Sequence, residues 1–160
     1  MRFSRTTAVI VLLLALVGLV AAALWFQQEQ GLYTVASVVD GDTIVLENGE
    51  RVRYLGIDTP ETVHPSKPVE CYGPEASARN KELVEGKRVR LESDTTDRDQ
   101  YGRLLRYVYV GDTLVNAVLV QEGYAYSYYY PPDTQRYQEL ATLEQEAKAQ
   151  GRGLWSACKP

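Results

Sequence analysis

Four short fragments of the sequence carry residues of the types that a site for phosphoester cleavage needs. The first is Asp-Gly-Asp-Thr at residues 40–43, and the second runs from Arg53 to Glu61 and ends in Asp-Thr-Pro-Glu. Each fragment could by itself be a capped turn. Together they supply the carboxylates of Asp40, Asp42, Asp58 and Glu61. Carboxylate and backbone carbonyl oxygens are hard ligands, so the two fragments predict a calcium site.

The other two fragments add cations and aromatic rings. Residues 97–103 form a polar stretch that delivers Arg103 at the start of a strand, although a solvated loop with a local ion pair has the same composition. Residues 124–130 contain five tyrosines. Tyrosine is common in strands and can cover a core edge, but its ring also stacks on nucleobases of any sequence. From the residues alone, both interpretations of the tyrosines stay open.

The elements that must position these fragments follow from the hydrophobic pattern. Alternating, β-branched segments predict strands, and segments bounded by Pro or Gly with a helical apolar stripe predict helices. The predicted strands are 32–39, 43–46, 51–57, 87–92 and 104–110, and the predicted helices are 74–85, 116–122 and 134–150. This order of elements predicts an α+β domain built on a small barrel.

The charge balance excludes one class of nucleic-acid-binding protein. Arg2 and Arg5 are two of the 17 basic residues and no acidic residue precedes Glu29, so residues 27–160 carry 15 basic and 21 acidic side chains, a net charge of −6. Such a domain does not bind nucleic acid through bulk positive charge alone. With 45% hydrophobic residues, it is expected to fold around a buried core.

Residues 8–26 form an uncharged apolar run that follows the two N-terminal arginines. As a helix this run spans about 28 Å, close to the hydrocarbon thickness of a bilayer. It exceeds the apolar region of most signal peptides, although the alanines at 21–23 satisfy a small-residue cleavage rule. An uncleaved membrane anchor and a cleaved signal both stay open, and both place the domain outside the cytoplasm. We predict an anchor or signal at 1–30 and one extracytoplasmic domain at 31–160.

Cys71 and Cys158 are the two cysteines of the chain. Outside the cytoplasm an even number of cysteines permits a disulfide. The bridge would close a loop of 87 residues, and the chain-entropy model gives such a loop a stabilisation of about 4–5 kcal/mol. Two unpaired buried thiols are the alternative.

Five motifs, in this order, carry a family resemblance. They are Asp-Gly-Asp-Thr at 40–43, Arg-x-x-x-x-Asp-Thr-Pro-Glu at 53–61, Tyr-Gly-Pro-Glu-Ala at 72–76, Asp-x-Tyr-Gly-Arg at 99–103 and Leu-Trp-Ser at 154–156. Any one of them is weak evidence, but together, in this order and spacing, they are specific. From residue 33 to about 157, the sequence resembles the staphylococcal nuclease (thermonuclease) family.

The resemblance implies an OB-fold, a five-stranded β-barrel with three helices, here preceded by the N-terminal hydrophobic helix. It also implies calcium-dependent hydrolysis of DNA and RNA phosphodiesters to products that carry a 3′-phosphate. By the resemblance, the calcium ligands are Asp42, Asp58 and the carbonyl of Thr59, with Asp40 and Glu61 acting through water.

The resemblance also assigns the groups that act on the substrate. Arg53 and Arg103 match the family's two catalytic arginines, and Glu61 matches its catalytic glutamate. Arginines can donate paired hydrogen bonds to a phosphate, and a carboxylate can either order or deprotonate the attacking water. Substrate contacts are implied at Tyr101, Tyr128, Tyr130 and Lys67. Gln100 and Pro131 stand where the best-known member has lysines, which implies weaker nucleotide affinity.

Two other functions compete with the enzyme. One is a non-catalytic nucleic-acid- or protein-binding module, since a fold can be used for binding alone. The other is a surface domain whose calcium is purely structural. The joint presence of the two arginines, Glu61, Asp42 and Asp58 favours the enzyme. We expect a monomer that acts on DNA and RNA, with single strands favoured.

Overall fold

A computed structural model of the 160-residue chain describes residues 14–19, 31–62 and 68–158. The chain divides into two compact units, Met1–Leu32 and Tyr33–Pro160. In the first unit, residues 14–19 are helical and exposed, and the rest of the apolar run predicted at 8–26 lies outside the described residues. Among the residues that are described, we find no helix with the length and apolar character needed to cross a bilayer.

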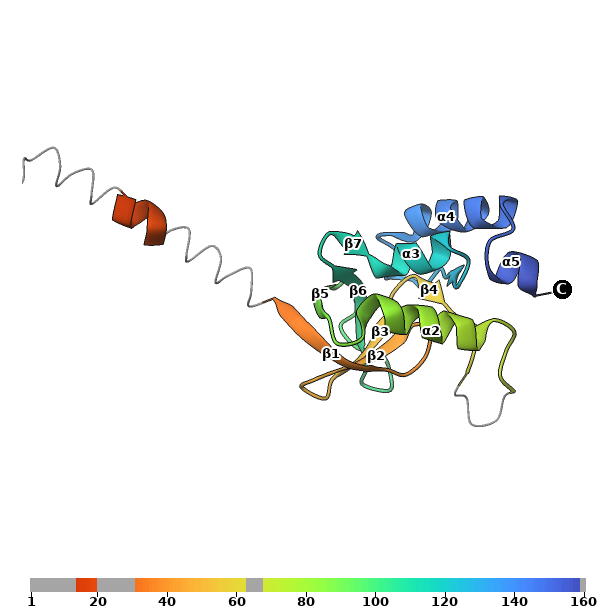
Figure 1. Ribbon diagram of the computed structural model, residues 1–160, viewed down its shortest axis with the longest axis horizontal. Helices are drawn as coiled ribbons and strands as arrows, with labels where there is room; N and C mark the ends of the chain where they lie inside the picture. Colours follow the sequence, from red (N-terminus) through yellow and green to blue (C-terminus); the bar gives the residue numbers. More distant parts are fainter. Residues whose placement is uncertain (1–13, 20–30, 63–67, 159–160) are drawn as a thin grey trace, which may run out of the picture. The chain divides into compact units, whose positions relative to one another are not determined.

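A closed five-stranded barrel forms the second unit (Figure 1). Its strands are β1 (Leu32–Val38), β2 (Thr43–Leu46), β3 (Arg51–Tyr54), β5 (Arg88–Glu92) and β6 (Leu104–Val110). They follow the order β3-β2-β1-β5-β6, and parallel pairing of β3 with β6 closes the ring. The predicted five-stranded barrel is therefore confirmed, and it fits the OB-fold. A short strand, β7 (Thr113–Leu114), continues the sheet beyond β6.

The strand predicted at 51–57 is interrupted, which corrects that expectation. Gly56 has a φ of +72°, a left-handed conformation that breaks the extended backbone after Tyr54. The chain resumes as β4 (Ile57–Asp58), which pairs antiparallel with β8 (Tyr126–Ser127) in a separate two-stranded sheet. The break carries Asp58 away from the barrel ladder while Arg53 remains on it.

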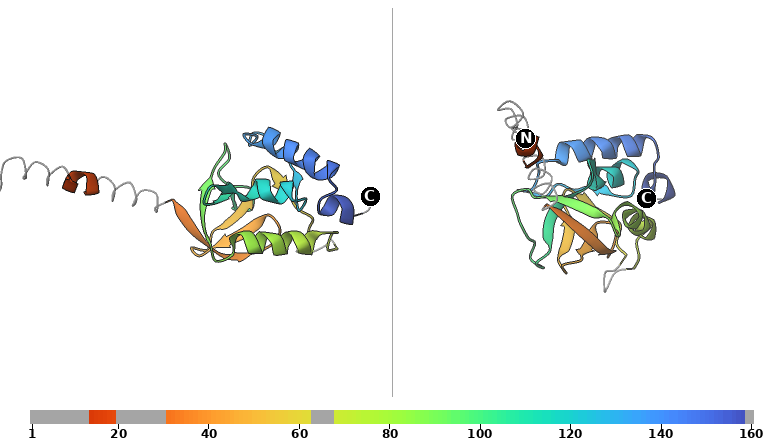
Figure 2. Two further views of the ribbon diagram at one scale, coloured as in Figure 1. Left: turned by 45° about the horizontal axis from the view of Figure 1, so that its top comes forward. Right: turned by 60° about the vertical axis from the view of Figure 1, so that its left-hand side comes forward.

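Helices pack around the barrel, with α3 (Val115–Gln121) between α2 (Gly73–Val84) and α4 (Tyr137–Ala149) (Figure 2). Pro74 lies in the first turn of α2, where its missing N–H costs no helical hydrogen bond. These three helices match the predicted ones, except that α4 begins at Tyr137 rather than at 134. A further single turn, α5 (Leu154–Ala157), was not predicted as a helix.

Two asparagines tie helices to the barrel through buried hydrogen bonds. Asn80 of α2 accepts from the Tyr54 hydroxyl at 2.9 Å and donates to the carbonyl of Asp40 at 3.0 Å. Asn116 of α3 donates to the Leu55 carbonyl at 2.9 Å, and its side-chain oxygen accepts from a β6 amide. Both side chains are fully buried, so removing either would leave backbone groups without partners. The turn that contains Asp40 is thereby fixed against α2.

Candidate active site

A polar pocket brings together side chains from the β1–β2 turn, from β3, from the segment that begins at β4, and from the residue before β6. We call it the acidic pocket. It is lined by Asp40, Asp42, Arg53, Asp58, Thr59, Pro60, Glu61 and Arg103. The structure thus places every residue predicted to bind metal or to catalyse in one concave site.

Asp42 is the most buried carboxylate of the acidic pocket, with a side chain 6% exposed. Its Oδ2 accepts hydrogen bonds from the amide and the hydroxyl of Thr59, at 2.9 and 3.0 Å. Its Oδ1 accepts from the Thr43 hydroxyl at 3.2 Å and lies 3.1 Å from Nε of Arg53. Four protein donors therefore orient this carboxylate.

Gly41 makes this arrangement possible by its lack of a side chain. A Cβ at this position would lie 2.6–2.7 Å from three side-chain atoms of Thr59, which is closer than real contacts allow. The Asp-Gly-Asp turn can therefore pack directly on Thr59, whose amide and hydroxyl hold Asp42. A glycine in an acidic turn gives no sequence signal for this contact, since it also suits an ordinary hairpin.

Arg53 neutralises two carboxylates of the acidic pocket at once. Besides its contact with Asp42, its Nη2 lies 2.7 Å from Oδ1 of Asp58. Its Nη1 donates to the carbonyls of Tyr54 and Ile57, at 2.8 and 2.9 Å. The break at Gly56 turns both carbonyls toward the guanidinium, so the local backbone holds this arginine in place.

Burial and neighbouring charge shift the pKa values of two aspartates in the pocket. Burial, reinforced by the negative charge of Asp42, raises the pKa of Asp40 to about 6. Burial also raises the pKa of Asp58, although the nearby Arg53 acts in the opposite direction. Burial therefore disfavours the charged forms of these two carboxylates. Such shifted pKa values are common in sites that bind a cation or a reacting group.

Arg103, the second arginine, is held by Asp99. Nε of Arg103 lies 2.6 Å from Oδ2 of Asp99, and the amides of Tyr101 and Arg103 donate to Oδ1 at 2.9 and 3.0 Å. Burial tends to raise the pKa of Asp99, but the hydrogen bonds from Arg103 and Tyr101 outweigh it and lower the pKa. Sequence reasoning gave Asp99 no role, although an aspartate four residues before an arginine in a polar loop was a usable signal.

The parallel pairing of β3 with β6 brings the two arginines to the same end of this strand pair. Arg53 lies opposite Leu105 in the β3–β6 ladder, and Arg103 directly precedes Leu104, the first residue of β6. Both guanidinium-bearing residues also line a second pocket, which we call the tyrosine pocket. Its other members are Tyr54, Leu55, Gly56, Ile57, Asp99, Leu105, Tyr128 and Tyr130. The arginines are thus shared between an acidic and an aromatic hollow.

The predicted substrate contacts lie in different places. Tyr128 and Tyr130 line the tyrosine pocket and stack on one another with ring centroids 6.0 Å apart. Tyr101 is 73% exposed and lies beside Arg103, whose Cζ is 5.5 Å from its ring centroid. Lys67 lies outside the described residues. Tyr128 and Tyr130 therefore share a pocket with both arginines, whereas Tyr101 does not line that pocket.

The donor chemistry of the acidic pocket suits a hard cation. Its carboxylates and backbone carbonyls are oxygen donors, and among the residues that the structure describes neither a histidine nor a cysteine lines it. Within residues 14–19, 31–62 and 68–158, however, no three His, Cys, Asp or Glu side chains converge closely enough to form a metal cluster. The guanidinium of Arg53 lies between Asp42 and Asp58 instead, so a cation would have to share these carboxylates with it.

A barrel of this topology fits the OB-fold, and here two arginines are shared between an acidic and an aromatic pocket. Residues 51–157 match the family model described as staphylococcal nuclease homologue. The chain is 42% identical over 126 residues to the thermonuclease of Staphylococcus intermedius, covering 77% of this chain and 75% of that protein. The chain belongs to the staphylococcal nuclease homologue family.

Two proteins of Bacillus subtilis (strain 168) are also similar. Endonuclease YncB is 48% identical over 128 residues, which cover 77% of this chain and 61% of YncB. The SPbeta prophage-derived endonuclease YokF is 49% identical over 128 residues, which cover 77% of this chain and 43% of YokF. The match thus spans less than two thirds of each Bacillus protein and three quarters of the staphylococcal one.

Proposed function

We propose that this protein is a calcium-dependent nuclease that hydrolyses phosphodiester bonds of DNA and RNA and leaves 3′-phosphate products. One observation carries the proposal most directly. Arg53 and Arg103 line both the acidic and the tyrosine pockets, so one phosphate can meet both arginines while its base reaches the tyrosines. The names of the similar proteins, thermonuclease and endonuclease, support the same reaction class.

The arginines bind the scissile phosphate and compensate the charge that grows on its oxygens during in-line attack. A guanidinium donates two parallel hydrogen bonds to such oxygens, which a lysine cannot reproduce. Donors that are fixed before the reaction stabilise the transition state without reorganisation. The two backbone carbonyls around Arg53 and the carboxylate of Asp99 supply this fixation.

Glu61 orders the attacking water or removes its proton. It lines the acidic pocket beside both arginines, and its Oε1 accepts a hydrogen bond from the amide of Thr62 at 2.9 Å. This bond helps to orient the carboxylate within the acidic pocket. A glutamate so placed is a suitable general base or water orienter.

Asp42, Asp58 and the carbonyl of Thr59 would hold the calcium ion, with Asp40 and Glu61 acting through water. The bound ion would supply Lewis-acid stabilisation of the phosphate. Its own charge also offsets part of the −6 carried by residues 27–160. With little bulk positive charge to attract nucleic acid, binding depends on the two arginines, the ion and the tyrosines.

We further propose that the protein acts as a monomer outside the cytoplasm, on single strands in preference to duplexes. The apolar run at 8–26 would serve as a membrane anchor or a cleaved signal. The disulfide between Cys71 and Cys158 supports this location, because disulfides persist in oxidising compartments. N-terminal sequencing of the protein recovered from cells separates the two alternatives: Met1 indicates an anchor, and a start after Ala23 indicates a signal.

The test of the activity uses the full chain with denatured DNA or RNA, in excess calcium or in EDTA. We expect cleavage with calcium and none in EDTA, with 3′-phosphate ends on the products. Arg53→Ala should abolish turnover. Arg98→Ala is the matched control, because Arg98 lies in the same loop as Arg103, pairs with Glu50 and lines neither pocket. Calcium-dependent binding without cleavage would instead support a binding module.

A further inference from the structure

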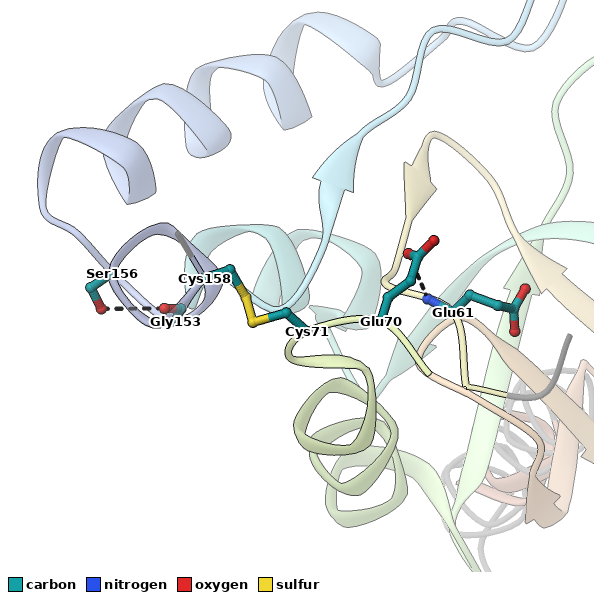
Figure 3. The surroundings of a disulfide bond; sticks show 6 residues. All are labelled: Glu61, Glu70, Cys71, Gly153, Ser156 and Cys158. Atoms are coloured by element: carbon teal, nitrogen blue, oxygen red, sulfur yellow. Dashed lines mark hydrogen bonds between the residues drawn. A yellow bond between two sulfur atoms is a disulfide. The ribbon is translucent and has the colours of Figure 1, made fainter. Parts of the chain in front are cut away.

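We propose that Glu70 and the Cys71–Cys158 disulfide together form a positioning device for Glu61. The catalytic consequence rests on the proposed function, whereas the structural claim does not. Glu70 lies nine residues after Glu61 in the chain, and the two are brought face to face by backbone and side-chain hydrogen bonds (Figure 3). Neither Glu70 nor the disulfide touches the acidic pocket directly.

Two hydrogen bonds join Glu70 to the backbone of Glu61. The amide of Glu61 donates to Oε2 of Glu70 at 3.0 Å, and the amide of Glu70 donates to the carbonyl of Glu61 at 2.9 Å. Figure 3 shows the carboxylate of Glu61 pointing away from Glu70. The two hydrogen bonds therefore join Glu70 to the backbone of Glu61. Glu70 therefore fixes where the Glu61 side chain starts.

The bond from the Glu61 amide to the Glu70 carboxylate needs a rigid support because it is exposed. Water competes with an exposed hydrogen bond, so such a pair persists only where the chain already holds its partners together. Glu70 receives this support from the next residue, Cys71, which forms a disulfide with Cys158. The Cα atoms of the two cysteines are 5.9 Å apart. The disulfide thus limits the movement of Glu70 relative to the C-terminal turn α5.

α5 is itself firmly attached to the rest of the domain. The amide of Leu154 donates to the carbonyl of Gly123 at 2.9 Å, and the Leu154 side chain is 3% exposed. The ring of Trp155 meets Tyr126 edge-on, with centroids 5.2 Å apart, and Tyr126 pairs with Asp58 in the β4–β8 ladder. The disulfide therefore connects Glu70 to a turn that also packs against β8, and β8 pairs with β4, the strand that carries Asp58.

The start of α2 completes the support from the other side. A Cβ at Gly73 would lie 3.0 Å from the carbonyl oxygens of Pro60 and Glu61 and 2.7 Å from Cγ2 of Thr62. The backbone of α2 therefore packs directly beneath residues 60–62. Glu61 is held between this helix start and Glu70, and Cys71 lies between the two along the chain.

Placement of Glu61 matters more for turnover than for binding. An error of about 1 Å in the position of a catalytic group can lower a rate by up to about 100-fold. Phosphate and base binding are assigned to Arg53, Arg103 and the tyrosines, whereas the hydrogen bonds of the device go to the backbone of Glu61. Loosening the device should therefore lower kcat and leave KM nearly unchanged.

The experiment compares four variants of the full chain, Glu70→Ala, Glu70→Gln, the double variant Cys71→Ser/Cys158→Ser, and Val89→Ala. Glutamine keeps a side-chain oxygen that can accept from the Glu61 amide, so it is the conservative rescue. Val89 is fully buried in β5 and lines neither pocket, so its truncation controls for loss of stability alone. Hydrogen exchange at the Glu61 amide is measured by NMR in EDTA, and kcat and KM are measured at saturating calcium.

We expect Glu70→Ala and the double serine variant to accelerate exchange at the Glu61 amide and to lower kcat by about 10-fold, with KM changed less than about twofold. Glu70→Gln and Val89→Ala should retain slow exchange and kcat close to the wild type. Unchanged exchange at Glu61 in both Glu70→Ala and the double serine variant would overturn the inference. If the variants show the expected exchange pattern but the wild-type protein does not cleave nucleic acid, only the proposed function would be overturned.

Discussion

Replacing Arg53 with glutamine should destabilise the metal-free protein and make its stability depend strongly on calcium. Asp42, with a side chain 6% exposed, would lose its charged partner, and glutamine is too short to span Asp42 and Asp58. Removing one partner of a buried ion pair costs about 3–5 kcal/mol. Three threonine donors to Asp42 remain, so we expect the lower end of this range. Loss of the ion pair with Asp58 adds little to this destabilisation, because the Asp58 side chain is exposed.

A loss of about 3 kcal/mol corresponds to a fall of about 10 °C in Tm for a domain of this size. Calcium should reverse most of this fall, because the ion supplies the positive charge that the variant lacks. In the wild type the ion would have to share Asp42 and Asp58 with the guanidinium, so we expect its stabilising effect to be smaller. A ligand stabilises the folded state in proportion to the logarithm of the ratio of its concentration to Kd. A calcium titration of both proteins therefore measures how much more the ion stabilises the variant than the wild type.

The assay is thermal unfolding of both proteins in EDTA and in a calcium series. Arg103→Gln is the control, because Arg103 pairs with Asp99 rather than with Asp42 or Asp58. Its loss of stability should not be recovered selectively by calcium. An equal calcium-induced rise in Tm for the wild type and Arg53→Gln would refute the view that the arginine and the ion share the same carboxylates.

Two further predictions concern neighbours of the site. Gly41→Ala should push Thr59 away from the Asp-Gly-Asp turn and weaken calcium affinity by about 10-fold or more, a change measured by calorimetric titration and contradicted by a wild-type Kd. Asp99→Asn should lower both kcat and stability, because Arg103 loses its charged anchor. Since the folded-state pKa of Asp99 is lowered, its stabilisation is fully present above about pH 4 and is lost as the pH falls through that lower value. Urea unfolding at several pH values checks this, and a gap between wild type and variant that stayed constant in acid would contradict it.

The sequence allowed the barrel to be predicted because its strands alternate clearly and end at strong turn signals. β4 and β8 were missed because each contains two residues, too few for a periodic pattern, and their pairing joins Ile57 to Ser127 across the chain. The residues of the acidic pocket were found through motif order. Their mutual contacts, such as the bridging of two carboxylates by Arg53, depend on tertiary geometry and leave no local trace.

The tyrosine-rich segment shows why composition alone was ambiguous. Of its five tyrosines, two line the tyrosine pocket, Tyr128 and Tyr130. The others pack on aromatic neighbours: Tyr124 on Tyr72, Tyr126 on Trp155 and Tyr129 on Tyr137. The fold therefore divides the five tyrosines into two groups that composition could not separate, and base stacking by Tyr128 and Tyr130 stays a prediction. The relation of Glu70 and α5 to Glu61 left no recognisable signal, since it passes through a disulfide between distant parts of the chain.

The parallel hydrogen-bond register of β3 and β6 holds Arg53 within the barrel and fixes Leu104, the residue that follows Arg103, opposite Val52. A single-residue insertion or deletion inside either strand would turn every following side chain to the opposite face. The polar loop before Arg103 and the segment after Glu61 can change length without disturbing that register. Attempts to diversify substrate choice on this scaffold should therefore vary those loops and leave residues 51–54 and 103–106 at constant length.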